Sequence, residues 1–357
     1  MKWLQRLKSR PFLIRLFNWE YWPYWAYYYP LIPWFLYLAA RYRHTCFFSP
    51  ANPGILTGGL GFESKYDTLM KIPGEWVPRS VLVRTGEVRS DWEPRIAAAG
   101  IFFPLIAKPD IGFRGFLVKR IDNAGELETY LASYPVDFIL QEYIEFPQEF
   151  GVLYHRYPGS EKGRITSVTL KEFLSVTGNG RSTLRELILA DQRASLQIDR
   201  LLETHRDSLA HVPADGEKIG LGQIGNHSKG TRFINGNHLV DDRLLATFDG
   251  IAGRIEGFCY GRFDLRAKDW ASLREGRDFR IIELNGVCSE PTHIYDQTQS
   301  TYWNALGELF YHWHLIGKIA WVNRKAGTPC IAPGDMLRQI SRLRQYFKRI
   351  KALVAKG

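Results

Sequence analysis

Twenty consecutive residues near the N-terminus, 21–40, carry no charge, which is the length of a membrane-spanning helix. Pro23, Pro30 and Pro33 interrupt this stretch, however, and much of it is tryptophan and tyrosine. Such rings favour the membrane–water interface over the hydrocarbon centre, because one end of each ring requires water. We therefore favour a segment that lies at an interface or is buried in the protein over one that crosses a membrane.

The whole chain has the composition of an ordinary globular protein, with 357 residues, 45% of them hydrophobic and 24% charged. The net charge of +10 is compatible with nucleic acid, an anionic membrane or polyphosphate-bearing substrates. Because no nucleic-acid-binding motif accompanies it, we expect no nucleic acid partner. Four scattered cysteines without CxxC spacing are typical of reduced cytosolic thiols, and no secretory signal is recognised. We expect a cytoplasmic protein.

Three blocks follow one another along the chain. Residues 1–60 form an aromatic-rich N-terminal segment, and residues 330–357 hold a basic amphipathic helix, expected at 335–356. Between them, residues 61–320 alternate short apolar runs with helical patterns, which predicts an α+β or α/β fold. The apolar runs are 80–83, 105–107, 138–140, 165–170 and 280–284. The helical patterns are 123–133 and 185–203.

The first candidate site is a strand that delivers a lysine to a glycine turn. Residues 106–109 predict the strand with Lys108, Gly112 and Gly115 lie in the turn, and a second strand is expected at 116–118. An ammonium group supplies a charge for phosphate oxygens, and glycines let backbone N–H groups approach them. Taken alone, a structural lysine is the commoner explanation.

The second candidate site is an apolar strand that runs into an acidic hinge, residues 139–144, followed by Glu149. Such a hinge suits adenine recognition by backbone groups near Glu142, and the later carboxylate suits ribose hydroxyls. An edge strand with solvated acids is the alternative, and it would be preferred if this motif stood alone.

The third candidate site is a set of metal ligands on two strands. Asp264 lies in the first strand, 261–266, and Glu283 and Asn285 end the second, 280–286. Positions two apart in a strand point to one face, so Glu283 and Asn285 project together, and an antiparallel neighbour adds Asp264. Mg²⁺ prefers one or two carboxylates together with water and nucleotide phosphates. The order of the three sites along the chain is the specific signal.

These motifs together resemble the ATP-grasp superfamily, in particular its D-alanine–D-alanine ligase and cyanophycin synthetase branches. Residues 176–188 are similar to part of the cyanophycin synthetase module, and residues 225–230, with His227, resemble the mobile phosphate-side loop of the family. The resemblance covers residues 65–300 and implies two α+β lobes that grip ATP. The ligases begin with a glycine-rich α/β lobe, for which the residues before Lys65 are too few and too aromatic.

The resemblance also implies a role for each matching residue. Arg262 and Lys108 would be catalytic, stabilising the charge of the acyl-phosphate and tetrahedral intermediates. Asp264, Glu283 and Asn285 would hold two Mg²⁺ ions, with Mn²⁺ as an alternative. Lys65 is the early phosphate-contacting lysine, with Lys71 as the less favoured candidate. The remaining nucleotide-binding residues would be Gly112, Gly115, Gln141, Glu142, Tyr143, Ile144, Glu149, Lys171 and Asn226.

The function implied is that of an ATP-dependent carboxylate–amine ligase that works through an acyl phosphate and releases ADP and phosphate. Its partners would be small-molecule or envelope-precursor acids and amines. A phosphotransferase and a non-catalytic, nucleotide-binding, membrane-associated protein are the alternatives. Basic amphipathic segments flank the core at both ends, so peripheral association with the inner face of an anionic membrane stays open beside simple docking on the core.

Overall fold

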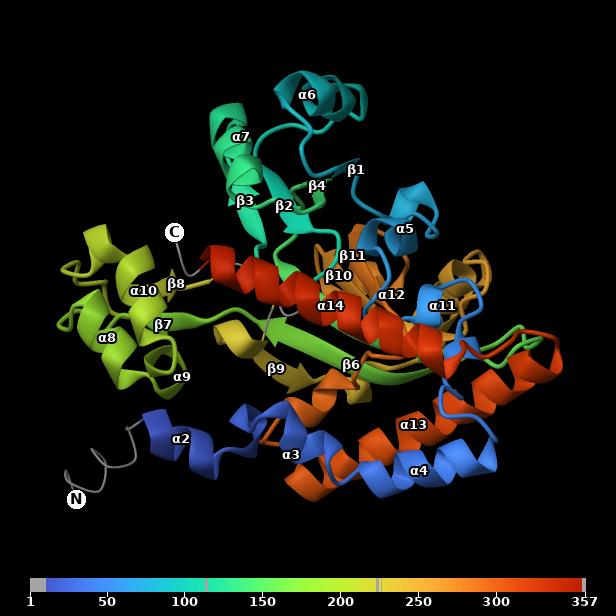
Figure 1. The fold of residues 1–357 in the computed structure, drawn as a ribbon. Coiled ribbons are helices and arrows are strands. Elements are labelled where there is room, and N and C mark those ends of the chain that lie inside the picture. The colour runs from blue at the N-terminus through green and yellow to red at the C-terminus, as the bar shows by residue number, and fades with distance from the viewer. Residues whose placement is uncertain (1–10, 113–114, 223–224, 226, 355–357) are drawn as a thin grey trace.

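The computed structural model describes residues 11–112, 115–222, 225 and 227–354. This part of the chain mixes helices with antiparallel sheets, so the predicted α+β class is confirmed. Two sheets, of four and five strands, lie on either side of a cleft, and a two-stranded ribbon stands apart from them (Figure 1).

The four-stranded sheet has the order β1-β4-β2-β3 and forms the small lobe. Its strands are β1 (Ser80–Val83), β2 (Leu105–Pro109), β3 (Lys119–Ile121) and β4 (Phe138–Glu142). Helices α6 (Arg89–Ala98) and α7 (Ala124–Ser133) pack on it, and Trp92 and Leu127 are buried in the shared core. The strand expected at 116–118 begins later, because Gly115 and Leu117 have φ of 66° and 52°, which belongs to a turn.

The five-stranded sheet has the order β11-β10-β5-β6-β9 and is covered on both faces. Its strands are β5 (Gln148–His155), β6 (Arg164–Glu172), β9 (Arg232–Asn235), β10 (Tyr260–Ala267) and β11 (Phe279–Asn285). One face packs against α5 (Lys65–Leu69), α11 (Asp242–Gly253) and α12 (Trp270–Arg274). The other packs against the N-terminal segment and α13 (Tyr302–Lys325) over part of its area and lines the cleft with polar side chains over the rest. The apolar residues of β10 therefore alternate with Arg262, Asp264 and Arg266.

The uncharged N-terminal stretch folds into short pieces. Its elements are α2 (Pro11–Phe17), the 3₁₀ helix η1 (Trp19–Tyr21), α3 (Tyr24–Tyr28) and α4 (Ile32–Arg41). Among the described residues, no helix combines the length and apolarity that a membrane span needs. Pro23 precedes α3 and Pro33 lies in the first turn of α4, the position where proline fits a helix. The inner side of this segment is buried in the protein, one of the two arrangements that the sequence favours: Tyr27, Leu31 and Leu38 are buried there.

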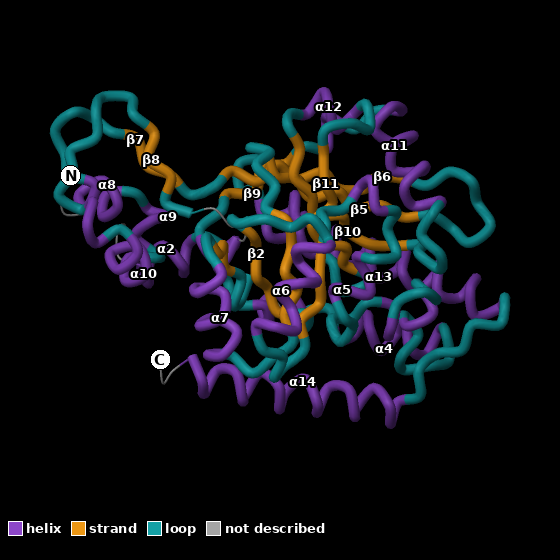
Figure 2. Tube along the Cα trace, turned by 90° about the horizontal axis from the view of Figure 1, so that it is seen from above, coloured by secondary structure: helices purple, strands orange, loops and turns teal. Residues whose placement is uncertain are grey.

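A small subdomain with a core of its own lies between β6 and β9. It consists of β7 (Ser175–Thr177), β8 (Lys218–Gly220), α8 (Leu184–Ala190), α9 (Gln192–Ser195) and α10 (Ile198–Thr204). The single helix predicted for 185–203 is wrong. Asp191 has an extended backbone, and its carboxylate accepts from the N–H groups of Arg193 and Ala194 at 2.9 and 2.7 Å, which starts a new helix. Figure 2 shows this subdomain to one side of the sheets.

The last helix, α14 (Pro333–Val354), links the two lobes. Near its start, the N–H of Ile331 donates to the Ser49 hydroxyl (2.9 Å), beside the large sheet and α13. Towards its end, Ile350 is 1% exposed within the core of the small lobe. The Tyr346 hydroxyl donates to the carbonyl of Ile111 (2.9 Å), just after β2. The helix is visible along the outside of the molecule in Figure 2.

One buried asparagine fastens the N-terminal segment to the large sheet. Asn52 is fully buried, and its amide donates to the carbonyls of Gly58 (2.9 Å) and Tyr260 (2.8 Å). Its carbonyl oxygen accepts from the N–H groups of Cys259 (2.8 Å) and Tyr260 (2.9 Å). Four backbone groups at the beginning of β10 and in the adjacent loop are therefore satisfied by one side chain.

Asn52→Ala should lower the free energy of unfolding by about 3 kcal/mol or more, because it leaves several buried backbone groups without partners. Urea titration followed by circular dichroism measures this. Asn304→Ala, at an exposed position of α13, is the matched control and should change it by less than about 0.5 kcal/mol. Equal stability of the two variants would show that Asn52 does not fasten the segment.

Candidate functional site

A cleft of about 1430 Å³ lies between the two lobes. The small lobe contributes β2, β4 and the loop after β2, and the large sheet contributes β6, β10 and β11. The N-terminal segment and the small subdomain close its far end. The predicted site residues that the structure describes line this cleft, so residues far apart in sequence meet in one place. The exception is Lys71, the less favoured alternative to Lys65, which does not line it. Asn226, Phe113 and Arg114 lie outside the described residues.

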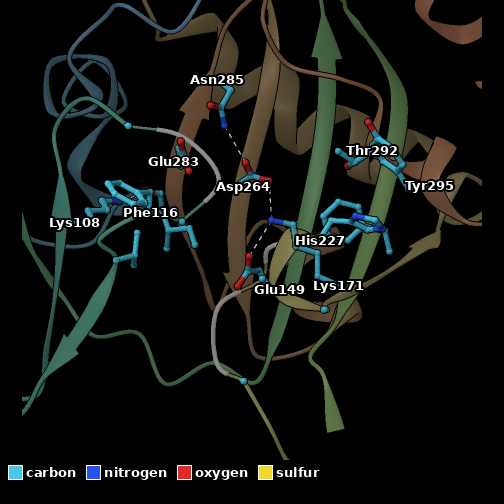
Figure 3. A pocket seen from close by; sticks show the side chains of 18 of the residues that line it. Lys108, Phe116, Glu149, Lys171, His227, Asp264, Glu283, Asn285, Thr292 and Tyr295 are labelled. Carbon is cyan, nitrogen blue, oxygen red and sulfur yellow. Dashed lines mark hydrogen bonds and ion pairs between the residues drawn. The ribbon is translucent and has the colours of Figure 1, made fainter. Parts of the chain in front are cut away.

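Lys108 reaches across the cleft from β2. Its ammonium group donates to the side-chain oxygen of Gln141 on β4 (3.0 Å) and to the carbonyl of Ile282 on β11 (2.8 Å). Burial lowers the pKa of Lys108 to about 8, more than nearby Glu283 offsets. Figure 3 shows Lys108 on the side of the small lobe, opposite the two carboxylates of the large sheet. A phosphate group placed between them would favour the charged form further.

The three predicted metal ligands converge on the neighbouring strands β10 and β11. Asp264 lies directly opposite Glu283 in the antiparallel register, and Arg262 lies opposite Asn285. The Asn285 amide donates to a carboxylate oxygen of Asp264 (2.9 Å), which leaves the amide oxygen for another partner (Figure 3). Two carboxylates and an amide oxygen are the hard donors that Mg²⁺ takes beside nucleotide phosphates.

Cations balance these carboxylates from three different elements. Lys171 on β6 donates to Asp264 (2.9 Å), Arg262 binds the same carboxylate (2.9 Å), and Lys65 of α5 donates to Glu283 (2.6 Å). Burial raises the pKa of Asp264, but Arg262 and Lys171 outweigh it and hold that pKa well below its usual range. Burial likewise raises the pKa of Glu283, and Lys65 brings it below its ordinary value. Both side chains are therefore ionised at neutral pH.

The donor set fits a nucleotide-bound divalent ion better than an ion held by protein alone. Within the described residues, no three His, Cys, Asp and Glu side chains gather into a metal site. An ion held by Asp264, Glu283 and Asn285 would need further oxygen ligands, which phosphates and water supply. It would also share Glu283 with Lys65, for which the resemblance implies a contact with phosphate.

The predicted adenine hinge lies at the end of β4. Gln141 is 3% exposed and holds Lys108, and the Glu142 carboxylate pairs with Arg79 of the neighbouring edge (2.7 Å). The ring of Tyr143 has the guanidinium of Arg120 5.1 Å from its centre. Glu142 thus pairs with an arginine, and Tyr143 and Ile144 line the cleft. Their part in adenine binding stays a prediction.

Glu149, predicted to bind ribose, is 5% exposed and binds Lys171 at 2.9 Å. Lys171 therefore joins the expected ribose site to the expected metal site (Figure 3). The phosphate-side loop lies against Glu149, because a Cβ atom on Gly225 would come within 2.0 Å of its carboxylate oxygen. Only glycine fits there.

The two loops over the cleft touch each other. The ammonium of Lys229, near the end of the phosphate-side loop, donates to the carbonyl of Gly115 in the turn after β2 (2.8 Å). This contact joins the large lobe to the small lobe, and both residues belong to loops that line the cleft. That the glycine turn covers phosphates stays a prediction.

Two clusters at the far end of the cleft were missed by the sequence analysis. In the first, the carboxylate of Glu20 accepts from Arg193 (2.9 Å) and pairs with His227 (2.9 Å). In the second, the hydroxyls of Tyr28 and Tyr295 donate to Glu290 at 2.6 and 2.7 Å. One signal was present: Glu20 is the only acidic residue among the first 48.

His293, which follows Glu290 by three residues, belongs to the core. It is 7% exposed, and its ring nitrogen is 2.8 Å from the Ser167 hydroxyl. Burial lowers its pKa to about 4, so the ring is neutral at physiological pH. Ser289 donates to the carbonyl of Gly286 (2.5 Å), which holds the turn after β11.

No protein-family model matches the sequence, and comparison with curated proteins finds no match. Solved structures do match. A bifunctional glutathione synthetase from Pasteurella multocida shares 17% identity at a TM-score of 0.38, over 69% of this chain and 36% of its own. D-alanine–D-alanine ligase from Bacillus anthracis shares 12% identity at a TM-score of 0.41, over 75% of this chain and 70% of its own. VanG D-Ala:D-Ser ligase from Enterococcus faecalis shares 14% identity at a TM-score of 0.38, over 73% of this chain and 61% of its own.

This chain thus spans little more than a third of the length of the glutathione synthetase. The matching structures include D-alanine–D-alanine ligases, the branch that the motifs resemble, at low identities and TM-scores. A likeness of this size identifies neither activity nor substrate, which have to be inferred from the chain's own residues.

Lys171→Met should lower the free energy of unfolding by about 3–5 kcal/mol at pH 7, because it leaves two buried carboxylates, Glu149 and Asp264, short of a partner. Lys218→Met, which removes an exposed ion pair with Glu172, is the control and should cost less than about 1 kcal/mol. Urea titrations of the three proteins measure both effects.

The same comparison has a defined pH dependence. The depressed pKa of Asp264 contributes stability that is present above the ordinary carboxyl pKa of about 3.9 and is lost as pH falls through the folded-state value. The gap between the wild type and Lys171→Met should therefore persist from pH 7 to about 4 and narrow only as pH falls below about 4. A gap that widened below pH 4 would contradict the ion-pair assignment.

Proposed function

We propose that the chain is an ATP-grasp ligase, which binds Mg-ATP in the cleft, converts a carboxylate to an acyl phosphate and joins it to an amine. The observation that carries the proposal is the convergence of Asp264, Glu283 and Asn285 opposite Lys108 across one cleft. Residues 61–320 would form the nucleotide-gripping unit. Residues 1–60 would replace the first-substrate lobe of D-alanine–D-alanine ligases.

The nucleotide would lie with its base at the hinge after β4 and its phosphates between the lobes. Ile144 and the backbone beside Glu142 line the base end, and Glu149 lies between that end and Asp264. Lys108 and the turn at Gly112 and Gly115 would contact the phosphates. Two Mg²⁺ ions held by Asp264, Glu283 and Asn285 would offset the charge of the phosphate oxygens.

The electrostatic difficulty of the reaction is the approach of one anion to another. A carboxylate oxygen of the acid attacks the γ-phosphorus, and the bond to the β,γ-bridging oxygen breaks to release ADP. Lys108 on one side and Arg262 on the other place positive charge beside the reacting groups before the reaction starts, in a cleft where such charges act strongly.

The second half of the reaction takes place at the far end of the cleft. A neutral amine attacks the acyl carbon, phosphate departs with the C–O bond electrons, and the ammonium proton is released to water. Arg262 would stabilise the tetrahedral oxyanion, and its guanidinium also donates to the carbonyl of Glu290 (3.2 Å), which fixes its position. The wall formed by Tyr28, Tyr295 and the Glu290 carboxylate is where the amine would approach.

Purified protein with ATP, Mg²⁺, hydroxylamine and a panel of candidate acids should release ADP and phosphate and form a hydroxamate with the correct acid. Asp264→Asn should lower this activity at least about 100-fold, because it removes a ligand charge. Asp215→Asn, at an exposed carboxylate of the small subdomain, should leave it unchanged. AMP and pyrophosphate would exclude the acyl-phosphate route, and a phosphorylated product without a hydroxamate would indicate a phosphotransferase.

Binding of ATP should take up protons near pH 8. Because free Lys108 has a pKa of about 8 and phosphate favours its charged form, roughly half a proton per ATP is expected at pH 8 and almost none at pH 6.5. Above pH 8 the affinity for ATP should fall. Calorimetry in buffers of different ionisation enthalpy measures the uptake, and Lys108→Met should abolish it. Unchanged uptake in that variant would place the titrating group elsewhere.

A further inference from the structure

One face of the N-terminal segment exposes large apolar side chains. In Figure 1, α2, α3 and α4 follow one another along the lower edge of the molecule, with α13 beside them. Phe17, Leu36 and Trp303 are 77%, 67% and 75% exposed. We call this surface the aromatic face; its exposed members are Phe12, Leu16, Phe17, Tyr24, Trp25, Tyr29, Ile32, Leu36, Tyr37 and Trp303.

The helices of this face are apolar on both sides. In α4, Leu38 is fully buried, while Ile32, Leu36 and Tyr37 point outwards. In α2, Ile14 is buried, while Phe12 and Phe17 are among the most exposed apolar side chains. A helix at the surface of a soluble protein turns polar residues outwards, and a helix that is apolar all round has a partner on both sides. Among the described elements, none covers this outer side.

Ring and hydrogen-bond contacts join the face into one surface. The hydroxyl of Tyr302 donates to the carbonyl of Ala26 in α3 (2.5 Å), and its ring lies 5.1 Å from that of Trp22 and 5.3 Å from that of Trp303. The indole of Trp22 in turn donates to the carbonyl of Leu16 at the end of α2 (3.0 Å). The beginning of α13 is thereby held beside α2 and α3.

The N-terminal segment carries an excess of positive charge. Its first 48 residues have no exposed acidic side chain that could balance this charge. The first 48 residues contain one acid, Glu20, which is buried against Arg193 and His227. The same residues contain seven lysines and arginines: Lys2, Arg6, Lys8, Arg10, Arg15, Arg41 and Arg43. The last three are exposed in the structure.

We propose that the aromatic face docks on the surface of an anionic lipid bilayer and lies in its interface without crossing it. Tryptophan and tyrosine at the rim of an apolar surface match the interface, and the surrounding cations match anionic headgroups. A second copy of the chain would bring this positive surface against itself, which electrostatics opposes. The face adjoins the cleft, because Tyr24, one of its members, and the exposed Arg15 of α2 both line the cleft.

Flotation with vesicles of phosphatidylcholine and phosphatidylglycerol, against vesicles of phosphatidylcholine alone, tests the proposal. The full chain should float with the anionic vesicles, and added salt should weaken the binding. A triple variant, Trp25→Ser, Leu36→Ser and Trp303→Ser, should lower the partition constant at least about tenfold, because it removes three large apolar contacts. None of these residues lines the cleft.

The matched control is a second triple variant, Val88→Ser, Phe102→Ser and Val212→Ser, at apolar positions that are also exposed but lie on the small lobe and the small subdomain. It should float as the wild type does, and thermal melts of both variants should match the wild type. The proposal is overturned if the wild type stays in solution with anionic vesicles, or if both triple variants float equally. It is also overturned if the wild type elutes as a dimer in gel filtration, the aromatic-face triple variant elutes as a monomer, and neither protein binds vesicles.

Discussion

Two carboxylates facing each other on neighbouring strands set the terms for the rest of this structure. Asp264 and Glu283 are paired in the register of β10 and β11, and their mutual repulsion has to be offset inside the protein. Lys65, Lys171 and Arg262 do this, and Lys108 approaches from the other lobe. One basic side chain on each of α5, β2, β6 and β10 is therefore directed at this pair of carboxylates or at the strand that carries one of them. Such an arrangement costs stability unless every member is matched.

Much of this arrangement was accessible from the sequence because it follows local rules. The apolar runs predicted as strands became β1, β2, β4, β6 and β11, since period and burial are encoded in neighbouring residues. Alternation along a strand placed Glu283 and Asn285 on one side, and the antiparallel register brought Asp264 to them. Their role as metal ligands stays a prediction.

The parts that escaped prediction depend on contacts distant in sequence. Lys65 pairs with Glu283, 218 positions later, and no local pattern shows that it meets a carboxylate and not a phosphate. Glu20 meets Arg193 and His227 for the same reason. The break at Asp191 in a helical pattern needed only a side chain that satisfies backbone N–H groups better than helix continuation does. The predicted lobe boundaries likewise give no hint that α14 returns to the small lobe.

The helix α14 makes the small lobe a body held at two ends. Ile350 sits in the core of that lobe, while Ser49 and α13 hold the approach to the helix beside the large sheet. Separation of the two lobes would have to displace this helix as well as the linkers between the lobes. It would have to bend the chain where the helix begins, near Pro333, or draw Ile350 out of the core of the small lobe. The entry and exit of ligands would then depend on α14, a helix that contributes no described residue to the lining of the cleft.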